Sequence, residues 1–150
     1  MLRRILRNMD LSENEIDESI YDAMLLSVDV AHALHPNKKE KMDITNKPVM
    51  GKGFCIKQAC SQSYATDAQA IAILCQLCDE KGIPYQRFVN RSDSRGGSTL
   101  GSIAGTLLPV KTVDIGIPIL AMHSACELMG VRDMKALSDC VTAFFGYLGK

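Results

Sequence analysis

The sequence predicts an α/β fold in which a mostly parallel sheet is flanked by helices. Apolar runs of strand length, such as 23–30 and 112–122, are rich in β-branched residues. Between them lie segments such as 67–81, whose apolar residues recur at helical spacing. Strands that alternate with helices are typical of parallel sheets with right-handed crossovers. A chain of 150 residues has the length of one domain with a substantial core.

The N-terminal elements are predicted from their capping residues. Residues 1–9 read as a basic helix with no N-cap residue before it. The segment 10–15 then supplies cap residues and an acidic first turn for a helix that runs to about Asp22. After the strand at 23–30, a polar loop extends from His35 to Lys52, and long loops of this kind are often functional.

The remaining elements alternate between strand and helix. A short strand at 54–57 precedes the helix at 67–81, which Gly82 ends. The segment 84–91 alternates like a strand, and 103–108 is a short helix of small and apolar residues that Pro109 ends. The strand at 112–122 follows, and a last helix at about 134–148 completes the layer.

The composition argues against two classes of partner. Lys and Arg total 17, as do Asp and Glu, so no net field favours nucleic acid. No apolar run approaches the length of a membrane span, and no signal peptide is recognisable, so we expect a cytoplasmic protein without a membrane partner. The six cysteines suit reduced thiols. Cys75 and Cys78 form a C-x-x-C whose apolar helical setting favours packing over a zinc or redox role.

A carboxylate and imidazoles follow the two apolar strands. Asp29 and His32 come at the end of the first, and His123 comes after the second. Ligands gather at the carboxyl ends of strands in open α/β sheets, and oxygen and imidazole nitrogen both serve zinc. The alternative is that Asp29 caps a turn and that the histidines are ordinary loop residues. A zinc site also requires three or four protein ligands, and the chain has few other candidates.

Other polar residues are candidates for ligand binding. The glycine-rich segment 96–101 at a helix start could offer N–H groups to an anion. It lacks the lysine of a phosphate-binding loop, and a tight loop that allows close packing is the favoured explanation. Lys57 and Tyr64 are a cation and a phenol suited to a carboxylate or an oxyanion. Arg91 and Asp93 form either an ion pair or a substrate contact.

Five motifs follow one another along the chain: SVDVAHALHPN at 27–37, GKG at 51–53 with IK at 56–57, YATD at 64–67, RSD at 91–93 with GSTLG at 97–101, and TVDIG at 112–116 through LAMHS at 120–124. In this order they resemble the aspartyl aminopeptidase family of dinuclear zinc exopeptidases, and the resemblance extends over about residues 20–146.

The resemblance implies a function and a role for each matching residue. It implies that Asp29 ligates one zinc ion and His123 the other. It also implies that Asp29, His32, Lys57 and Tyr64 contact the bound peptide or the tetrahedral intermediate. Two zinc ions would activate a bridging water and polarise the scissile carbonyl. The implied activity is removal of acidic or neutral N-terminal residues from peptides.

The resemblance is to the C-terminal part of that family's catalytic domain, so residues 1–150 are expected to form an incomplete zinc-peptidase-like α/β/α sandwich. The family's first histidine ligand, bridging aspartate and glutamate pair, which includes the general base, belong to an upstream part. We therefore expect no activity from this chain alone, and a homo-oligomer or a complementary N-terminal half as its partner. The alternative functions are a non-catalytic remnant that serves as an assembly or binding module, and an anion- or nucleotide-binding domain built on the 96–101 loop.

Overall fold

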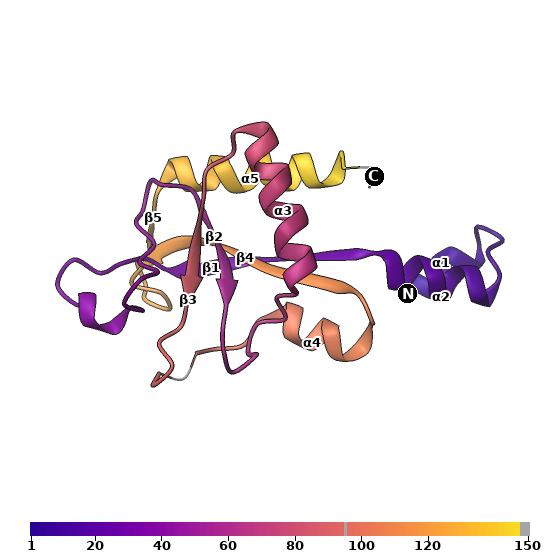
Figure 1. Ribbon diagram of the computed structural model, residues 1–150, viewed down its shortest axis with the longest axis horizontal. Coiled ribbons are helices and arrows are strands. Elements are labelled where there is room, and N and C mark those ends of the chain that lie inside the picture. The colour runs from indigo at the N-terminus through magenta and orange to yellow at the C-terminus, as the bar shows by residue number, and fades with distance from the viewer. Residues whose placement is uncertain (95, 148–150) are drawn as a thin grey trace.

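The computed structural model describes residues 1–94 and 96–147, and an α/β fold extends over them (Figure 1). The main helices are α1 (Leu2–Arg7), α2 (Glu13–Asp22), α3 (Ala68–Lys81), α4 (Leu100–Leu107) and α5 (Val131–Phe145), with a 3-10 turn at Lys39–Lys41. The strands are β1 (Met24–His32), β2 (Phe54–Gln58), β3 (Tyr85–Val89), β4 (Lys111–Leu120) and β5 (Leu128–Met129). No helix in the described part of the chain is long and apolar enough to cross a membrane.

The sheet is mixed, with the strand order β1-β4-β2-β3 and with β5 paired to β4. β1 and β4 are parallel, and so are β2 and β3. These two pairs meet in an antiparallel contact between β2 and β4. The predicted α/β class with flanking helices is confirmed, but the antiparallel contact in the middle of the sheet was not predicted from the sequence.

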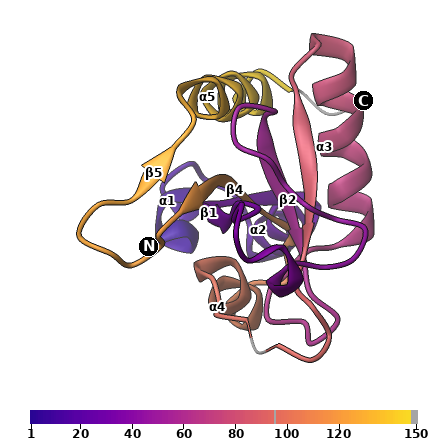
Figure 2. The ribbon, with the colours of Figure 1, turned by 90° about the vertical axis from the view of Figure 1, so that its left-hand side faces the viewer.

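Helices cover the two faces of the sheet unequally. α3 and α5 lie together on one side, and α4 lies on the other (Figure 2). The principal core joins α3 and α5 to β2 and β4 through fully buried side chains such as Phe54, Leu74 and Ile115. A smaller cluster that includes Tyr64 and Phe88 lies beneath the loop after β1.

Local signals explain where most helices begin and end. Ser12 and Glu15 form a capping box at the start of α2. The Asp67 carboxylate accepts the N–H groups of Gln69 and Ala70 at the start of α3. Gly82 ends α3 in the left-handed conformation, with φ of 64°, as predicted.

Several predicted boundaries are corrected by the structure. β1 continues to His32, two residues beyond the predicted end. α4 begins at Leu100 and α5 at Val131, each three residues earlier than expected, and β5 was not predicted. α5 ends at Phe145, and the expected final residue, Leu148, lies outside the described residues.

α1 and α2 form a hairpin that projects from one end of the sheet (Figure 1). Arg3 pairs with Asp17, and Arg7 pairs with Glu13 at 2.6 Å, both at the surface of the hairpin. Ile16 and Ile20 of α2 are buried. α1 has no side-chain cap, as its sequence predicted.

Candidate functional site

The five predicted site residues line one cavity of about 160 Å³, which we call the site cavity. They come from β1, β2 and the segments after β2 and β4. The side chains are Asp29, His32, Lys57, Tyr64 and His123, and the other lining residues are Val30, Ala31, Phe88, Gly97, Ser98 and Met122. Residues from widely separated parts of the sequence therefore meet where the resemblance implies that they act together.

The position of Asp29 differs from the sequence expectation. Asp29 lies within β1, three residues before its end, and pairs with Gly116 of β4. A side chain on Gly116 would place its Cβ 2.7 Å from the backbone of Val30, so only glycine allows β4 to approach β1 this closely. The site cavity therefore extends from the carboxyl end of β1 back along the strand to Asp29, which had been expected at the strand end.

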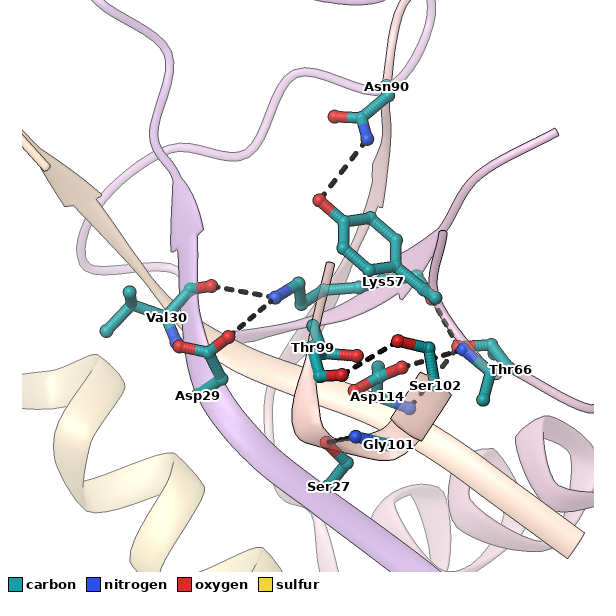
Figure 3. Close-up of polar contacts among 12 residues, drawn as sticks. Ser27, Asp29, Val30, Lys57, Thr66, Asn90, Thr99, Gly101, Ser102 and Asp114 are labelled. Atoms are coloured by element: carbon teal, nitrogen blue, oxygen red, sulfur yellow. Dashed lines mark hydrogen bonds and ion pairs between the residues drawn. The ribbon is translucent and has the colours of Figure 1, made fainter. Parts of the chain in front are cut away.

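Lys57 provides a buried positive charge at the floor of the site cavity. Its side chain is 4% exposed, whereas that of Asp29 is 43% exposed. The Lys57 ammonium donates to the Val30 carbonyl at 3.0 Å and to Asp29 Oδ2 at 3.3 Å (Figure 3). It also lies 4.6 Å from the centroid of the Tyr64 ring, within cation–π range. These contacts compensate for removing the ammonium from water.

Tyr64 covers Lys57 and presents a phenol to the cavity. Its hydroxyl oxygen accepts a hydrogen bond from the Asn90 side chain at 3.2 Å, which leaves the hydroxyl proton free for another acceptor. Burial raises the pKa of Tyr64, and the hydrogen bond from Asn90 opposes this shift. The phenol is therefore protonated at neutral pH and is able to donate to a developing negative charge.

The two histidines of the cavity differ in their surroundings. His32 is the last residue of β1, and its ring centroid lies 6.4 Å from that of Phe88. Partial desolvation, followed by the nearby His123 and the charge of Lys57, lowers the pKa of His32, which favours the neutral imidazole. His123 lies in the exposed loop after β4 with a φ of 68°, and its N–H donates to Glu127 Oε1 at 2.5 Å.

The donor atoms suit part of a zinc site. Asp29 offers carboxylate oxygen and His123 imidazole nitrogen, and both are accessible. Within residues 1–94 and 96–147, however, no group of three or more His, Cys, Asp or Glu side chains is placed to hold a metal ion. If Asp29 and His123 each bind a different zinc ion, each ion needs at least two further ligands from outside this set.

Other sequence candidates have structural explanations. The thiols of Cys78 and Cys140 lie 3.8 Å apart in the core, and Cys75 is partly buried, so the C-x-x-C packs between helices. Arg91 and Asp93 form an exposed ion pair at 2.5 Å. The Gly101 N–H of the glycine-rich loop donates to Ser27 at 3.1 Å. Because the Asp114 side chain also lies against Gly101, a carboxyl group already occupies the place proposed for an anion.

Two contributors to the site were not identified from the sequence. Asn90 donates to the Tyr64 hydroxyl, but it falls within the predicted strand at 84–91, where no pattern indicates which side chain it meets. Asp114 accepts the Ala65 N–H beside Tyr64, and its sequence signal is a carboxylate inside an otherwise apolar run. Gly97 and Ser98, from the candidate segment 96–101, also line the site cavity.

An α/β fold with a carboxylate and imidazoles beside one cavity is consistent with the class of metallopeptidases. The family described as "Aminopeptidase I zinc metalloprotease (M18)" matches residues 1–145. The chain belongs to this M18 family of zinc aminopeptidases, which confirms the predicted broader family. The narrower aspartyl aminopeptidase group stays a prediction.

Individual relatives agree with this assignment. The "Probable M18 family aminopeptidase 2" of Clostridium novyi is 48% identical over 137 residues, which is 89% of this chain and 32% of that protein. A protein in the structure of the Ape4 and Nbr1 complex is 33% identical, with a TM-score of 0.89 over 97% of this chain and 28% of that one. The S. cerevisiae mApe1 dodecamer is 27% identical, with a TM-score of 0.73 over 83% of this chain and 27% of that one. The chain thus spans about a third of the length of the curated relative.

Proposed function

We propose that this chain contributes the site cavity to a zinc aminopeptidase that removes acidic or neutral N-terminal residues from peptides. The observation that supports the proposal best is that all five side chains implied by the resemblance line one cavity of about 160 Å³. In the proposal, Asp29 and His123 each ligate one of two zinc ions. Asp29, His32, Lys57 and Tyr64 contact the peptide.

The peptide-binding part of the proposal follows from the hydrogen-bonding capacity of Lys57 and Tyr64. An ammonium has three donors, and the Val30 carbonyl and Asp29 use two of those on Lys57. The Tyr64 hydroxyl accepts from Asn90 and keeps its own proton to donate. A carboxylate or an oxyanion next to both groups would receive two donors in a site of low exposure, where such bonds are strong.

Zinc, when bound, would polarise the scissile carbonyl and lower the pKa of a bound water. The described residues supply a carboxylate and an imidazole, but no group of three or more possible ligands among them is placed to hold an ion. Because these residues do not complete a metal site, we propose that groups from outside them complete it. A complementary N-terminal half or a homo-oligomer would serve, and the dodecameric assembly of the mApe1 structure favours the latter.

A second candidate function is a non-catalytic assembly or binding module. The observation that favours it is the exposed apolar surface on α4 and β1, where Leu100 and Leu107 are 79% and 76% exposed. Surfaces of this kind mark interaction sites. In this case the site cavity would be retained without turnover.

The test is zinc content per purified chain, measured together with hydrolysis of leucyl and aspartyl anilides. We expect zinc to bind where a partner or a second copy supplies the further ligands. Asp29→Ala and His123→Ala should then each lower the zinc affinity by more than the roughly 10-fold that loss of a hydrogen bond to a ligand costs. His35→Ala is the matched control, because His35 is also an exposed histidine after β1 but does not line the site cavity.

The two readouts separate the candidates. Zinc binding that both ligand variants weaken, without turnover, supports a partial site that needs another chain. Zinc binding with turnover supports an active site completed by self-association. Zinc content unaffected by either variant contradicts the ligand assignment, and absence of zinc and turnover favours the binding module.

A further inference from the structure

Asp114 is a buried carboxylate in the middle of β4. Its residue is 0% exposed, and every residue from Thr112 to Ile119 is buried. Oδ2 accepts the Ala65 N–H at 2.9 Å, whereas Oδ1 has no hydrogen-bond partner among the described residues. A buried, partly satisfied carboxylate destabilises a strand that an apolar residue would pack well, so its presence calls for an explanation.

Hydrogen bonds connect Asp114 to the residue after Tyr64 and, through Thr66, to Lys57. Besides the Ala65 contact, the Asp114 N–H donates to Thr66 Oγ1 at 3.3 Å. The Thr66 hydroxyl in turn donates to the Lys57 carbonyl at 2.6 Å (Figure 3). The segment 64–66 is therefore fastened to β4 on one side and to β2 on the other. This attachment fixes the backbone from which the Tyr64 ring extends over the Lys57 ammonium.

Asp114 also supports the opposite wall of the site cavity. A Cβ on Gly101 would lie 2.8 Å from Asp114 Oδ1 and 2.8 Å from the Cβ of Ser27. The absence of a side chain at Gly101 thus allows the first turn of α4 to rest against the carboxylate, where the helix dipole favours a negative charge. The residues just before this turn, Gly97 and Ser98, line the site cavity.

We propose that Asp114 is the positioning residue of the site cavity: it holds the 64–66 segment in place and thereby sets Tyr64 over Lys57. The Asp114 carboxylate contacts the 64–66 segment and lies against the first turn of α4. It therefore acts through Tyr64 and α4 and does not touch a substrate. The inference uses the Tyr64–Lys57 pair of the proposed function, but its test requires neither zinc nor peptide, so the two fail separately.

The test compares two buried carboxylates by NMR. Asp133 is also 0% exposed and accepts backbone N–H groups, from Gly51 at 2.6 Å and Gly53 at 2.7 Å, but it lies at the start of α5. In Asp114→Ala we expect amide hydrogen exchange at Ala65 to accelerate at least about 10-fold and the NOEs between the Tyr64 ring and the Lys57 side chain to weaken. In Asp133→Ala we expect faster exchange at Gly51 and Gly53 and unchanged Tyr64 NOEs.

Two further variants keep the test decisive if Asp114→Ala does not fold. Asp114→Asn retains an acceptor for the Ala65 N–H and should keep the Tyr64–Lys57 NOEs. Thr66→Val removes the hydroxyl that links the Asp114 main-chain N–H to the Lys57 carbonyl and should weaken the Tyr64–Lys57 NOEs. Unchanged NOEs in a folded Asp114→Ala would overturn the role of the carboxylate, and unchanged NOEs in Thr66→Val would overturn the second attachment of the 64–66 segment to β4. Equal loss in Asp133→Ala would also overturn the role of the carboxylate, because Asp114 would then contribute only general stability.

Discussion

The two faces of the sheet differ in how completely they are covered. On the face covered by α3 and α5, Leu74 is 0% exposed within a continuous core. On the other side, three apolar side chains of α4 are exposed, as is Val28 of β1, the edge strand beside it. We call this group the open edge: Val28, Leu100, Ile103 and Leu107. Leu100, Ile103 and Leu107 recur at three- and four-residue spacing, so they share one face of α4.

The side chains that line the site cavity also differ in their exposure to solvent. Lys57 and Tyr64 are buried among core residues, whereas Asp29 and His123 are exposed. The difference indicates that packing within this chain fixes Lys57 and Tyr64, while the proposed metal ligands face outward. That arrangement is the one expected if a second polypeptide completes the metal site.

The largest expected difference between the faces is in stability. Leu74→Ala removes a buried side chain from α3 and should lower the free energy of unfolding by about 2–5 kcal/mol, because a cavity is left in a packed core. Leu107→Ala makes the same chemical change on α4, and the exposed site should limit its effect to about 0.5 kcal/mol. Urea unfolding followed by far-UV circular dichroism measures both values.

This pair of variants would contradict the comparison if the two losses were similar. A large loss for Leu107→Ala would mean that α4 is buried in solution, either against the chain itself or in an oligomer. Repeating the unfolding at several protein concentrations separates these cases, since only an oligomer has concentration-dependent stability.

The open edge should mediate association. β1 pairs only with β4 among the described strands, so its other side offers backbone groups to a further strand. We expect sedimentation velocity to detect concentration-dependent association. The Val28→Lys, Leu107→Glu double variant should weaken it at least about 10-fold, which corresponds to about 1.4 kcal/mol. Phe145→Glu, a similar change at an 81% exposed residue of α5, is the control and should have little effect.

A wild-type chain that remains monomeric at all concentrations would remove the argument for self-association through the open edge. The proposed partner would then be a different polypeptide. Association that the Phe145 variant weakens more than the double variant would place the contact on α5 instead.

The sequence predicted those features whose causes are local. Ser12 with Glu15, and Asp67 with Gly82, mark helix ends through contacts within a few residues, and those helices were placed correctly. The antiparallel contact between β2 and β4 joins residues about 60 positions apart, such as Cys55 and Gly116, and no local pattern specifies it. The error in placing Asp29 at a strand end has the same origin, since pairing with β4 extends β1 through His32.

The candidate site was predicted through the resemblance more than through residue patterns. Patterns alone identified Asp29, His32 and His123 as a group and left Lys57 and Tyr64 as separate possibilities. The structure brings all five to one cavity. Asp114 was noted as part of a strand, but its contact with Ala65 depends on a fold that brings residues 49 positions apart together.

The smallest predicted difference concerns the helix caps of the two faces. Asp67 caps α3 with two hydrogen bonds, so Asp67→Ala should lower the free energy of unfolding by about 1 kcal/mol. Thr99 precedes α4, but its buried hydroxyl has no partner among the described residues. Thr99→Val keeps the shape of the side chain, suits the extended backbone at this position and removes an unsatisfied polar group. It should therefore leave the free energy of unfolding unchanged or raise it slightly in the same urea unfolding experiment.

A loss of unfolding free energy for Thr99→Val comparable with that for Asp67→Ala would mean that the hydroxyl has a partner in solution. The start of α4 would then be as firmly anchored as the start of α3.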